Sequence, residues 1–311
     1  MHRHNSALFR RPVLGPRTRS RSMRRFARCG FAVTIAATGL LILTGLANAE
    51  SLRAVQSEIA GLLAHPALRG AEVGALVVSS RGDGIYRLCA ETPLIPASNM
   101  KLVTVATALE LLGPDYDCSQ MPGAHEAESL GTLARRILKP SDNALADTLL
   151  AELPMMAGRP DLAPDQLCAE AWGDRGLHLQ GTCWADGSGL SRRDMMSAEV
   201  IVGLLEAMDG SQYRQEFITA LPIAGVDGTL RRRMRGGPAQ GRVRAKTGTL
   251  TGVSALSGYA ETDGGERLTF AMVMNGFACD KERVRRIQDE VCAALVELDR
   301  EAEGSERAEG D

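Results

Sequence analysis

Residues 242–274 read RVRAKTGTLTGVSALSGYAETDGGERLTFAMVM. This segment contains three short strand-like runs, 242–247, 253–261 and 267–274, and glycine-containing turns separate them. Runs of this length, bounded by such turns, are typical of consecutive antiparallel strands. The last third of the chain is therefore predicted to contribute three strands to one sheet.

The beginning of the chain adds two further strand-like runs. Residues 71–79 are rich in β-formers, and after the turn Arg81-Gly82-Asp83-Gly84 the pattern resumes over 85–89, which predicts a hairpin. Residues 97–222, in contrast, contain several segments with apolar residues at helical spacing, as do 52–63 and 281–298. We expect an α/β (α+β) fold: an antiparallel sheet of about five strands from both chain ends, flanked by helices, with a helical subdomain beside it.

Composition and charge exclude one class of function. Of the 311 residues only 4% are aromatic, so platforms for stacking bases are poorly supplied. Residues 1–49 hold nine arginines and no acidic residue; without them, 27 basic residues face 38 acidic ones. Nucleic-acid binding depends on cation–phosphate contacts, so a chain this acidic is not expected to bind nucleic acid.

The N-terminus has the pattern of a secretory signal. A basic segment ending at Arg28 is followed by an apolar run, 31–46, and then by Ala47-Asn48-Ala49, a small-x-small cleavage site. The apolar run is about sixteen residues, shorter than the roughly 20 that a membrane helix needs, which disfavours the alternative of a transmembrane anchor. We predict a signal peptide over 1–49, a periplasmic domain over 50–300 and a disordered acidic tail over 301–311.

Cysteine and histidine usage bears on disulfides and metals. Six cysteines remain after residue 49, an even number that suggests disulfides in an oxidising compartment. Cys168 and Cys183 are close in sequence and are expected to pair. There is no CxxC motif, and His65, His125 and His178 are widely spaced, so we expect no metal site and no cofactor.

Lysine is the informative residue type in this chain. Among 36 basic residues only four are lysines: Lys101, Lys139, Lys246 and Lys281. A lysine amine can be tuned to a neutral base by burial and neighbours, whereas an arginine guanidinium keeps its proton. Ser98 and Lys101 lie three residues apart at a predicted helix start, where their side chains share a face. A serine hydroxyl becomes a good nucleophile when an adjacent base takes its proton, although a capping serine beside an exposed lysine is the simpler explanation.

Two further motifs strengthen the catalytic interpretation. Ser141-Asp142-Asn143 stands between two predicted helices, and Lys246-Thr247-Gly248 lies in the first predicted C-terminal strand. Each has a structural alternative, a helix cap for the first and an edge-strand lysine before a turn glycine for the second. Two of the four lysines nevertheless fall in the two motifs that require one, and the three motifs occur in a set order. Together they point to a serine nucleophile activated by lysine.

Ser-x-x-Lys, Ser-x-Asn and Lys-Thr-Gly, in that order, are the signature of penicillin-recognising serine enzymes. The chain resembles that superfamily, and more specifically the D-alanyl-D-alanine carboxypeptidase/endopeptidase family, the low-molecular-mass class C penicillin-binding proteins. The resemblance covers most of residues 51–300 and rests on 96–102 (PASNMKL), 139–143 (KPSDN), 186–192 (DGSGLSR), 241–250 (GRVRAKTGTL) and 252–259. It implies a β-lactamase/transpeptidase-like fold. It also implies peptidoglycan stem peptides as substrates and β-lactams as covalent inhibitors; the oligomeric state stays open.

The resemblance further implies a role for each motif residue. Ser98 is the nucleophile, Lys101 its general base, and Ser141 relays the proton with Lys246 to the leaving amine. The implied substrate-binding residues are Asn143, which positions the substrate amide, Lys246, Thr247 and Thr249, which hold the terminal carboxylate, and Gly248. Backbone N–H groups of Ser98 and Thr249 form the oxyanion hole. The loop 186–192 either borders the site or is a glycine turn pinned by its own hydrogen bonds.

The chain departs from the family pattern at one place. Family members usually carry long domains inserted between the first two motifs, whereas Ser98 and Ser141 are only 43 positions apart here. Endopeptidase activity, which those domains support, is therefore open.

Rival interpretations remain. A β-lactamase or esterase of the same fold would need a deacylating glutamate, and the region of Glu170 and Asp174 lacks the asparagine of an ExxxN element. A catalytically idle peptidoglycan-binding module is a second alternative, which the intact motifs disfavour. A zinc amidase is the weakest, given the histidine count.

Overall fold

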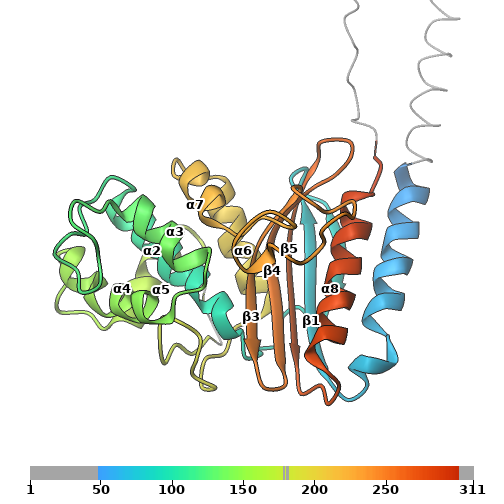
Figure 1. The fold of residues 1–311 in the computed structure, drawn as a ribbon, viewed down its shortest axis with the longest axis horizontal. Helices are drawn as coiled ribbons and strands as arrows, with labels where there is room; N and C mark the ends of the chain where they lie inside the picture. The colour runs from blue at the N-terminus through green and yellow to red at the C-terminus, as the bar shows by residue number, and fades with distance from the viewer. Residues whose placement is uncertain (1–47, 178, 180–181, 301–311) are drawn as a thin grey trace, which may run out of the picture. The chain divides into compact units, whose positions relative to one another are not determined.

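The computed structural model describes residues 48–177, 179 and 182–300. Its centre is one five-stranded antiparallel sheet with the strand order β2-β1-β5-β4-β3 (Figure 1). The strands are β1 (Glu72–Ser79), β2 (Gly84–Leu88), β3 (Val243–Leu250), β4 (Val253–Glu261) and β5 (Arg267–Asn275). The predicted assembly of one sheet from both chain ends is confirmed.

The sheet is covered on both faces. Neighbouring residues of a strand point to opposite faces, and in β4 both Ala255 and Leu256 are fully or almost fully buried, in two different hydrophobic clusters. The Leu256 cluster includes Val55 of a helix within residues 48–63 and Val284 of α8 (Lys281–Val296). These two helices therefore cover one face of the sheet, on the right in Figure 1.

The other face packs against the helical part of the chain, on the left in Figure 1. Its helices are α2 (Met100–Leu112), α3 (Leu130–Leu138), α4 (Asn143–Met156), α5 (Pro164–Gly173), α6 (Ala198–Asp209) and α7 (Arg214–Ala220). Every residue from Met100 to Leu109 is buried, because the other helices surround α2 and the sheet lies at its end. The predicted helical subdomain is confirmed; its helices run from Met100 to Ala220, and Ala97–Asn99 form a separate 3-10 turn before α2.

Three sequence predictions have different outcomes here. The expected Cys168–Cys183 disulfide is wrong, because all six cysteines of the described residues are unpaired. The physical reason is placement: Cys168 is fully buried in α5 against α2, while Cys183 is exposed in a bridge to Met195. The signal peptide, apart from residues 48 and 49, and the tail 301–311 lie outside the described residues. Within those residues, the structure has no helix that is both long and apolar enough to cross a membrane.

Candidate active site

The helical wall of the site begins at the turn before α2. Ala97 has a φ of +46°, an unusual conformation for a residue with a Cβ, and it places Ser98 in a 3-10 turn at the helix start. Lys101, one helical turn later, is fully buried, and its Nζ lies 3.2 Å from the Ser98 Oγ. The predicted meeting of these two side chains on one helix face is what the structure has.

The Lys101 amine has three hydrogen-bond neighbours. Besides the Ser98 hydroxyl, these are the Asn143 Oδ1 at 2.7 Å and the Ser188 backbone oxygen at 2.5 Å. Both carbonyl oxygens can only accept, so each takes one N–H of the amine. The remaining tetrahedral position, an N–H in the charged form and the lone pair in the neutral form, is thereby directed at Ser98. This arrangement is what a general base for the serine requires.

Burial also tunes the proton affinity of this amine. It lowers the pKa of Lys101 to about 8, and the charges of Asp147, Asp186 and Asp142 act in the opposite direction. A pKa near 8 leaves a usable neutral fraction at neutral pH, whereas an ordinary lysine is almost fully charged there.

The second motif, Ser141-Asp142-Asn143, contributes one residue to helix capping and two residues to the site. The Asp142 side chain caps α4 by accepting a hydrogen bond from the Leu145 N–H at 2.9 Å, so the helix-cap alternative holds for this residue. Ser141, with a φ of +65°, and Asn143 instead point their side chains to the two lysines. A left-handed serine is a strained position of the kind that clusters at functional sites.

The opposite wall of the site is the edge strand β3. Lys246 is fully buried, and its Nζ donates to the Ser141 Oγ and to the Thr247 backbone oxygen, both at 2.8 Å. Burial, together with the like charge of Lys101, lowers the pKa of Lys246 well below its ordinary value. The alternative of an edge-strand lysine before a turn glycine is right about the edge strand, but Gly248 lies within β3 and not in a turn. Lys246 contacts the serine that was predicted to relay a proton with it.

Gly248 lets β3 approach the nucleophile turn. A Cβ at this position would lie 2.6 Å from the Pro96 backbone oxygen and 3.2 Å from the Ala97 Cβ. Any larger side chain would push the strand away from Ser98. The contribution of Gly248 to the site is thus close packing of the two walls.

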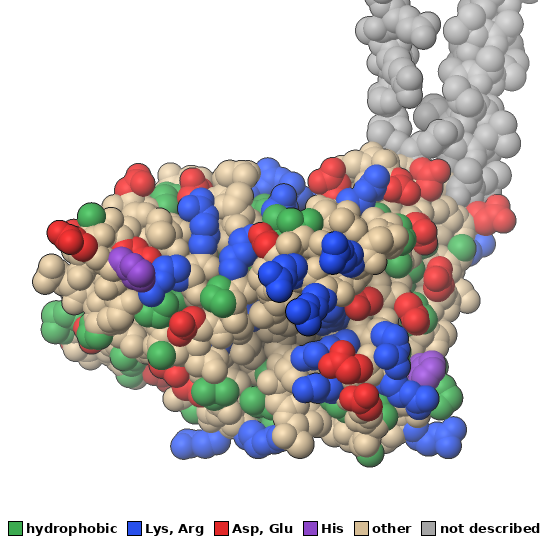
Figure 2. Space-filling view, in the orientation of Figure 1, with side chains coloured by type: hydrophobic (Ala, Val, Ile, Leu, Met, Phe, Trp, Pro, Cys, Tyr) green, Lys and Arg blue, Asp and Glu red, His purple; other side chains and the backbone are tan. Residues whose placement is uncertain are grey.

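Ser98, Ser141, Thr247 and Thr249 line a single cleft of about 680 Å³. The Thr247 hydroxyl donates to the Thr229 hydroxyl at 2.8 Å, which ties β3 to a 3-10 turn at Gly228–Leu230. The remaining lining residues are Gly228, Thr229, Arg231, Arg232, Arg233, Glu282 and Arg285. Figure 2 shows basic side chains gathered around the hollow on this face.

Sequence reasoning missed the segment 228–233 and Arg285. The only signal in 228–233 was a glycine before a run of three arginines, and Arg285 is one of several cations in an amphipathic helix. The loop 186–192 both borders the site and is a turn held by its own hydrogen bonds, the two alternatives considered for it. The Asp186 carboxylate accepts hydrogen bonds from backbone N–H groups of the loop, and the loop supplies the Ser188 oxygen to Lys101.

Among the described residues, no three His, Cys, Asp or Glu side chains come together in a way that could hold a metal ion. The polar side chains that line the cleft carry hydroxyls, guanidinium groups and the Glu282 carboxylate, and the Lys101 amine lies beside the Ser98 hydroxyl, an arrangement that suits acyl transfer to serine.

Comparison with known proteins agrees with the family that the three motifs indicate. The model of the D-Ala-D-Ala carboxypeptidase 3 (S13) family matches residues 55–121 and 119–298. The chain belongs to this family. The resemblance predicted from the three motifs is confirmed. The two matched pieces of this S13 chain meet at residues 119–121, between Ser98 and Ser141, where the expected inserted domains are missing.

Two curated relatives illustrate the extent of similarity of this S13 chain. It is 34% identical over 190 residues to "D-alanyl-D-alanine carboxypeptidase" of an Actinomadura species, covering 59% of this chain and 35% of that protein. It is 31% identical over 170 residues to "D-alanyl-D-alanine carboxypeptidase DacB" of Haemophilus influenzae, covering 51% and 34%. The chain thus spans about a third of the length of the curated relatives it matches.

Solved structures share the fold. Penicillin binding protein 4 (dacB) of Haemophilus influenzae superposes with a TM-score of 0.65 at 15% identity, covering 75% of this chain and 97% of that one. The TLA-1 extended spectrum β-lactamase superposes with a TM-score of 0.60 at 13% identity, covering 80% and 99%. The predicted β-lactamase/transpeptidase-like fold is confirmed.

Proposed function

We propose that this chain is a serine-type D-Ala-D-Ala carboxypeptidase that acts on peptidoglycan stem peptides and is acylated by β-lactams. The observation that carries the proposal is the Lys101 amine. Its carbonyl contacts to Asn143 and Ser188 leave one tetrahedral position, which faces the Ser98 hydroxyl at 3.2 Å. Membership of the S13 family and its relatives named as carboxypeptidases support the same conclusion.

The reaction proceeds through an acyl-enzyme. The neutral Lys101 amine takes the Ser98 proton as Oγ bonds to the carbonyl carbon of the penultimate D-Ala. The C–N bond to the terminal D-Ala then breaks, and its nitrogen receives a proton through Ser141, which touches Lys246 at 2.8 Å. Water then attacks the ester carbonyl carbon and gives a proton to Lys101. The bond from that carbon to the Ser98 Oγ breaks, the Oγ regains the proton, and the shortened peptide leaves as a carboxylic acid that ionises to the carboxylate.

Substrate binding uses the remaining motif residues. Asn143 holds the substrate amide, and Thr247 and Thr249 line the cleft where the terminal carboxylate lies. A charge contribution of Lys246 to that carboxylate stays a prediction, as does the oxyanion hole formed by the N–H groups of Ser98 and Thr249.

The test uses the chain without residues 1–49 and two substrates, a muropeptide ending in D-Ala-D-Ala and a crosslinked muropeptide dimer. We expect release of D-Ala, read by mass, and faster cleavage of the pentapeptide than of the dimer, because the inserted domains are missing. Radiolabelled or fluorescent penicillin should add its mass to the peptide containing Ser98. No D-Ala release by the wild type, or undiminished adduct in Ser98→Ala, would overturn the proposal.

The β-lactamase alternative has a weaker basis. Glu170, in the region considered for a deacylating carboxylate, is exposed on α5 and pairs with Arg159 at 3.2 Å. Rapid turnover of a chromogenic β-lactam, in place of a persistent adduct, would favour that alternative.

Export to the periplasm is a separate proposal, based on the pattern of residues 1–49. Its test is N-terminal sequencing of the protein from a periplasmic fraction, with the mature chain expected to begin at Glu50. A mature N-terminus still carrying the apolar run 31–46 would contradict it.

A further inference from the structure

The carboxylate of the proposed substrate requires a cationic partner in the cleft, and both lysine amines already donate hydrogen bonds within the protein. Lys101 is occupied by Ser98, Asn143 and Ser188, and Lys246 donates to Ser141 and to a backbone oxygen. Both amines are fully buried behind the residues that line the cleft. The cationic side chains that line the cleft are guanidinium groups, those of Arg231, Arg232, Arg233 and Arg285.

Arg285 of α8 is the guanidinium that touches a predicted carboxylate-binding residue. Its Nη2 donates to the Thr249 hydroxyl oxygen at 3.1 Å, and its Nη1 pairs with Glu282 at 2.6 Å. The side chain is 28% exposed, so it is neither buried away from the cleft nor fully solvated. Because the Thr249 oxygen accepts from Arg285, the hydroxyl proton is free to point to a bound anion.

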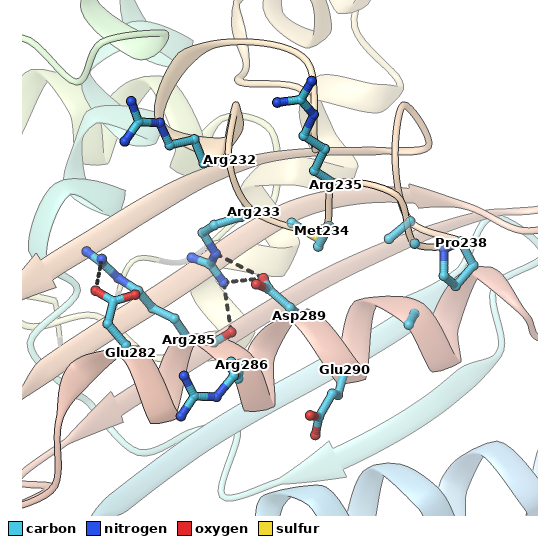
Figure 3. Close-up of a pocket in the computed structure, with 13 residues that line it drawn as sticks. Arg232, Arg233, Met234, Arg235, Pro238, Glu282, Arg285, Arg286, Asp289 and Glu290 are labelled. Carbon is cyan, nitrogen blue, oxygen red and sulfur yellow. Dashed lines mark hydrogen bonds and ion pairs between the residues drawn. The ribbon is translucent and has the colours of Figure 1, made fainter.

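The backbone around Arg285 is fixed by a second arginine. Arg233 donates to the Arg285 backbone oxygen at 3.2 Å and forms an ion pair with Asp289 at 2.7 Å, one turn further along α8 (Figure 3). The segment with Arg232 and Arg233 is thus tied to α8. In Figure 3 Arg232 points away from α8, while Arg285 stays next to Glu282. Because its backbone is fixed and its guanidinium donates to Thr249 and Glu282, the Arg285 side chain loses little further freedom when it binds an anion.

We propose that Arg285 binds the terminal carboxylate of the substrate together with Thr249, and that it sets the preference of this site for a free carboxylate. The proposal rests on the proposed function, because it assigns the residue that recognises the end of the same peptide. A guanidinium donates two parallel hydrogen bonds to a carboxylate, and such charge-assisted bonds are stronger than neutral ones. The residue belongs to the C-terminal helix, outside all three sequence motifs.

The experiment compares two acylating probes, benzylpenicillin and its methyl ester, which differ only in whether the carboxylate is free. Second-order acylation rate constants are measured by mass for wild type, Arg285→Ala, Arg285→Lys and Arg286→Ala. We expect Arg285→Ala to slow benzylpenicillin about 10- to 100-fold. The ester should change less than about twofold, since it makes no charge-assisted bond. Arg285→Lys should restore part of the preference. Arg286, an exposed neighbour on α8 that does not line the active-site cleft, is the matched control and should leave both rates unchanged.

Each outcome decides. Equal slowing of acid and ester in Arg285→Ala would indicate a merely structural role and overturn the inference, as would unchanged rates with both probes. A wild type that penicillin does not acylate would count against both the inference and the proposed function. If Arg285→Ala slows acylation by benzylpenicillin but not by its ester, and the wild type releases no D-Ala from peptides, the role of Arg285 would be upheld and the proposed carboxypeptidase activity would be wrong. Thermal unfolding of each variant verifies that it is folded.

Discussion

The helical wall and the strand wall of the cleft each bury one lysine, but they surround it differently. Lys101, on the helical wall, has the charges of Asp147, Asp186 and Asp142 nearby, which partly offset the effect of burial and leave its pKa at about 8. On β3, burial and the like charge of Lys101 both lower the pKa of Lys246. We therefore propose two tasks for the same residue type: a base that changes protonation near neutral pH, and a donor that holds Ser141.

The largest expected effect comes from Lys101→Arg. A guanidinium keeps its proton and cannot take one from Ser98, so penicillin acylation should fall by about 10³-fold or more. Lys281→Arg, on the exposed start of α8, is the matched control and should react like wild type. Acylation is measured by mass after each variant is shown to fold. A Lys101→Arg rate near wild type would mean that Lys101 is not the base.

The pH dependence of wild-type acylation should be the next largest effect. The neutral amine is the reactive form, and with a pKa of about 8 its fraction rises nearly tenfold per unit below pH 8. Between pH 6 and pH 9 the acylation rate constant should therefore rise roughly 100-fold and level off above pH 8. A rate profile that is flat, or that falls with rising pH, would contradict the assignment of Lys101 as the lysine that changes protonation near neutral pH.

Lys246→Arg should have a smaller effect than Lys101→Arg. The role of Lys246 is to donate hydrogen bonds, which a guanidinium can partly reproduce, although it is larger than the amine it replaces. We expect acylation to fall about 10- to 100-fold, the scale for a misplaced donor in an active site. If stopped-flow rates show a loss as great as that of Lys101→Arg, the two lysines share one task.

The smallest effect on acylation should come from Asp194→Asn, a test of the loop that supplies Ser188. Burial raises the pKa of Asp194 to about 6, and the charge of Asp186 adds to this effect. Because the folded pKa lies above the unfolded one, the protonated carboxyl stabilises the fold at low pH, and this contribution is lost as pH rises from about 4 through 6.

The asparagine of the variant does not titrate, so the variant should not lose stability in this way. The difference in unfolding free energy, variant minus wild type, should therefore increase by up to about 3 kcal/mol between about pH 4 and pH 6. Acylation should change less than about threefold at neutral pH, because Ala185 and Asp186 can still donate to the amide oxygen. Urea unfolding of both proteins at pH 4, 5 and 7 checks the sign. A constant difference would show that Asp194 does not titrate in this range.

The sequence alone predicts the local parts of this molecule correctly. The hairpin of β3 and β4 follows from glycine-bounded runs, and the meeting of Ser98 with Lys101 follows from helical spacing. Both depend on residues close together in the chain, where backbone geometry sets the distances. The order of the three motifs also indicates the family, because side-chain chemistry is visible in the sequence.

Tertiary structure decides the rest. The Lys246–Ser141 contact joins residues 105 positions apart, and Arg285 reaches Thr249 because α8 packs against β4, the neighbour of β3 in the sheet. Ser188 contributes a backbone oxygen, which every residue possesses and no sequence pattern reveals. Whether Cys168 forms a disulfide is also decided by tertiary structure, because it depends on which face of α5 is buried. Distances between elements are set by how their surfaces pack, and pKa values by the burial that results, so neither could be obtained from spacing along the chain.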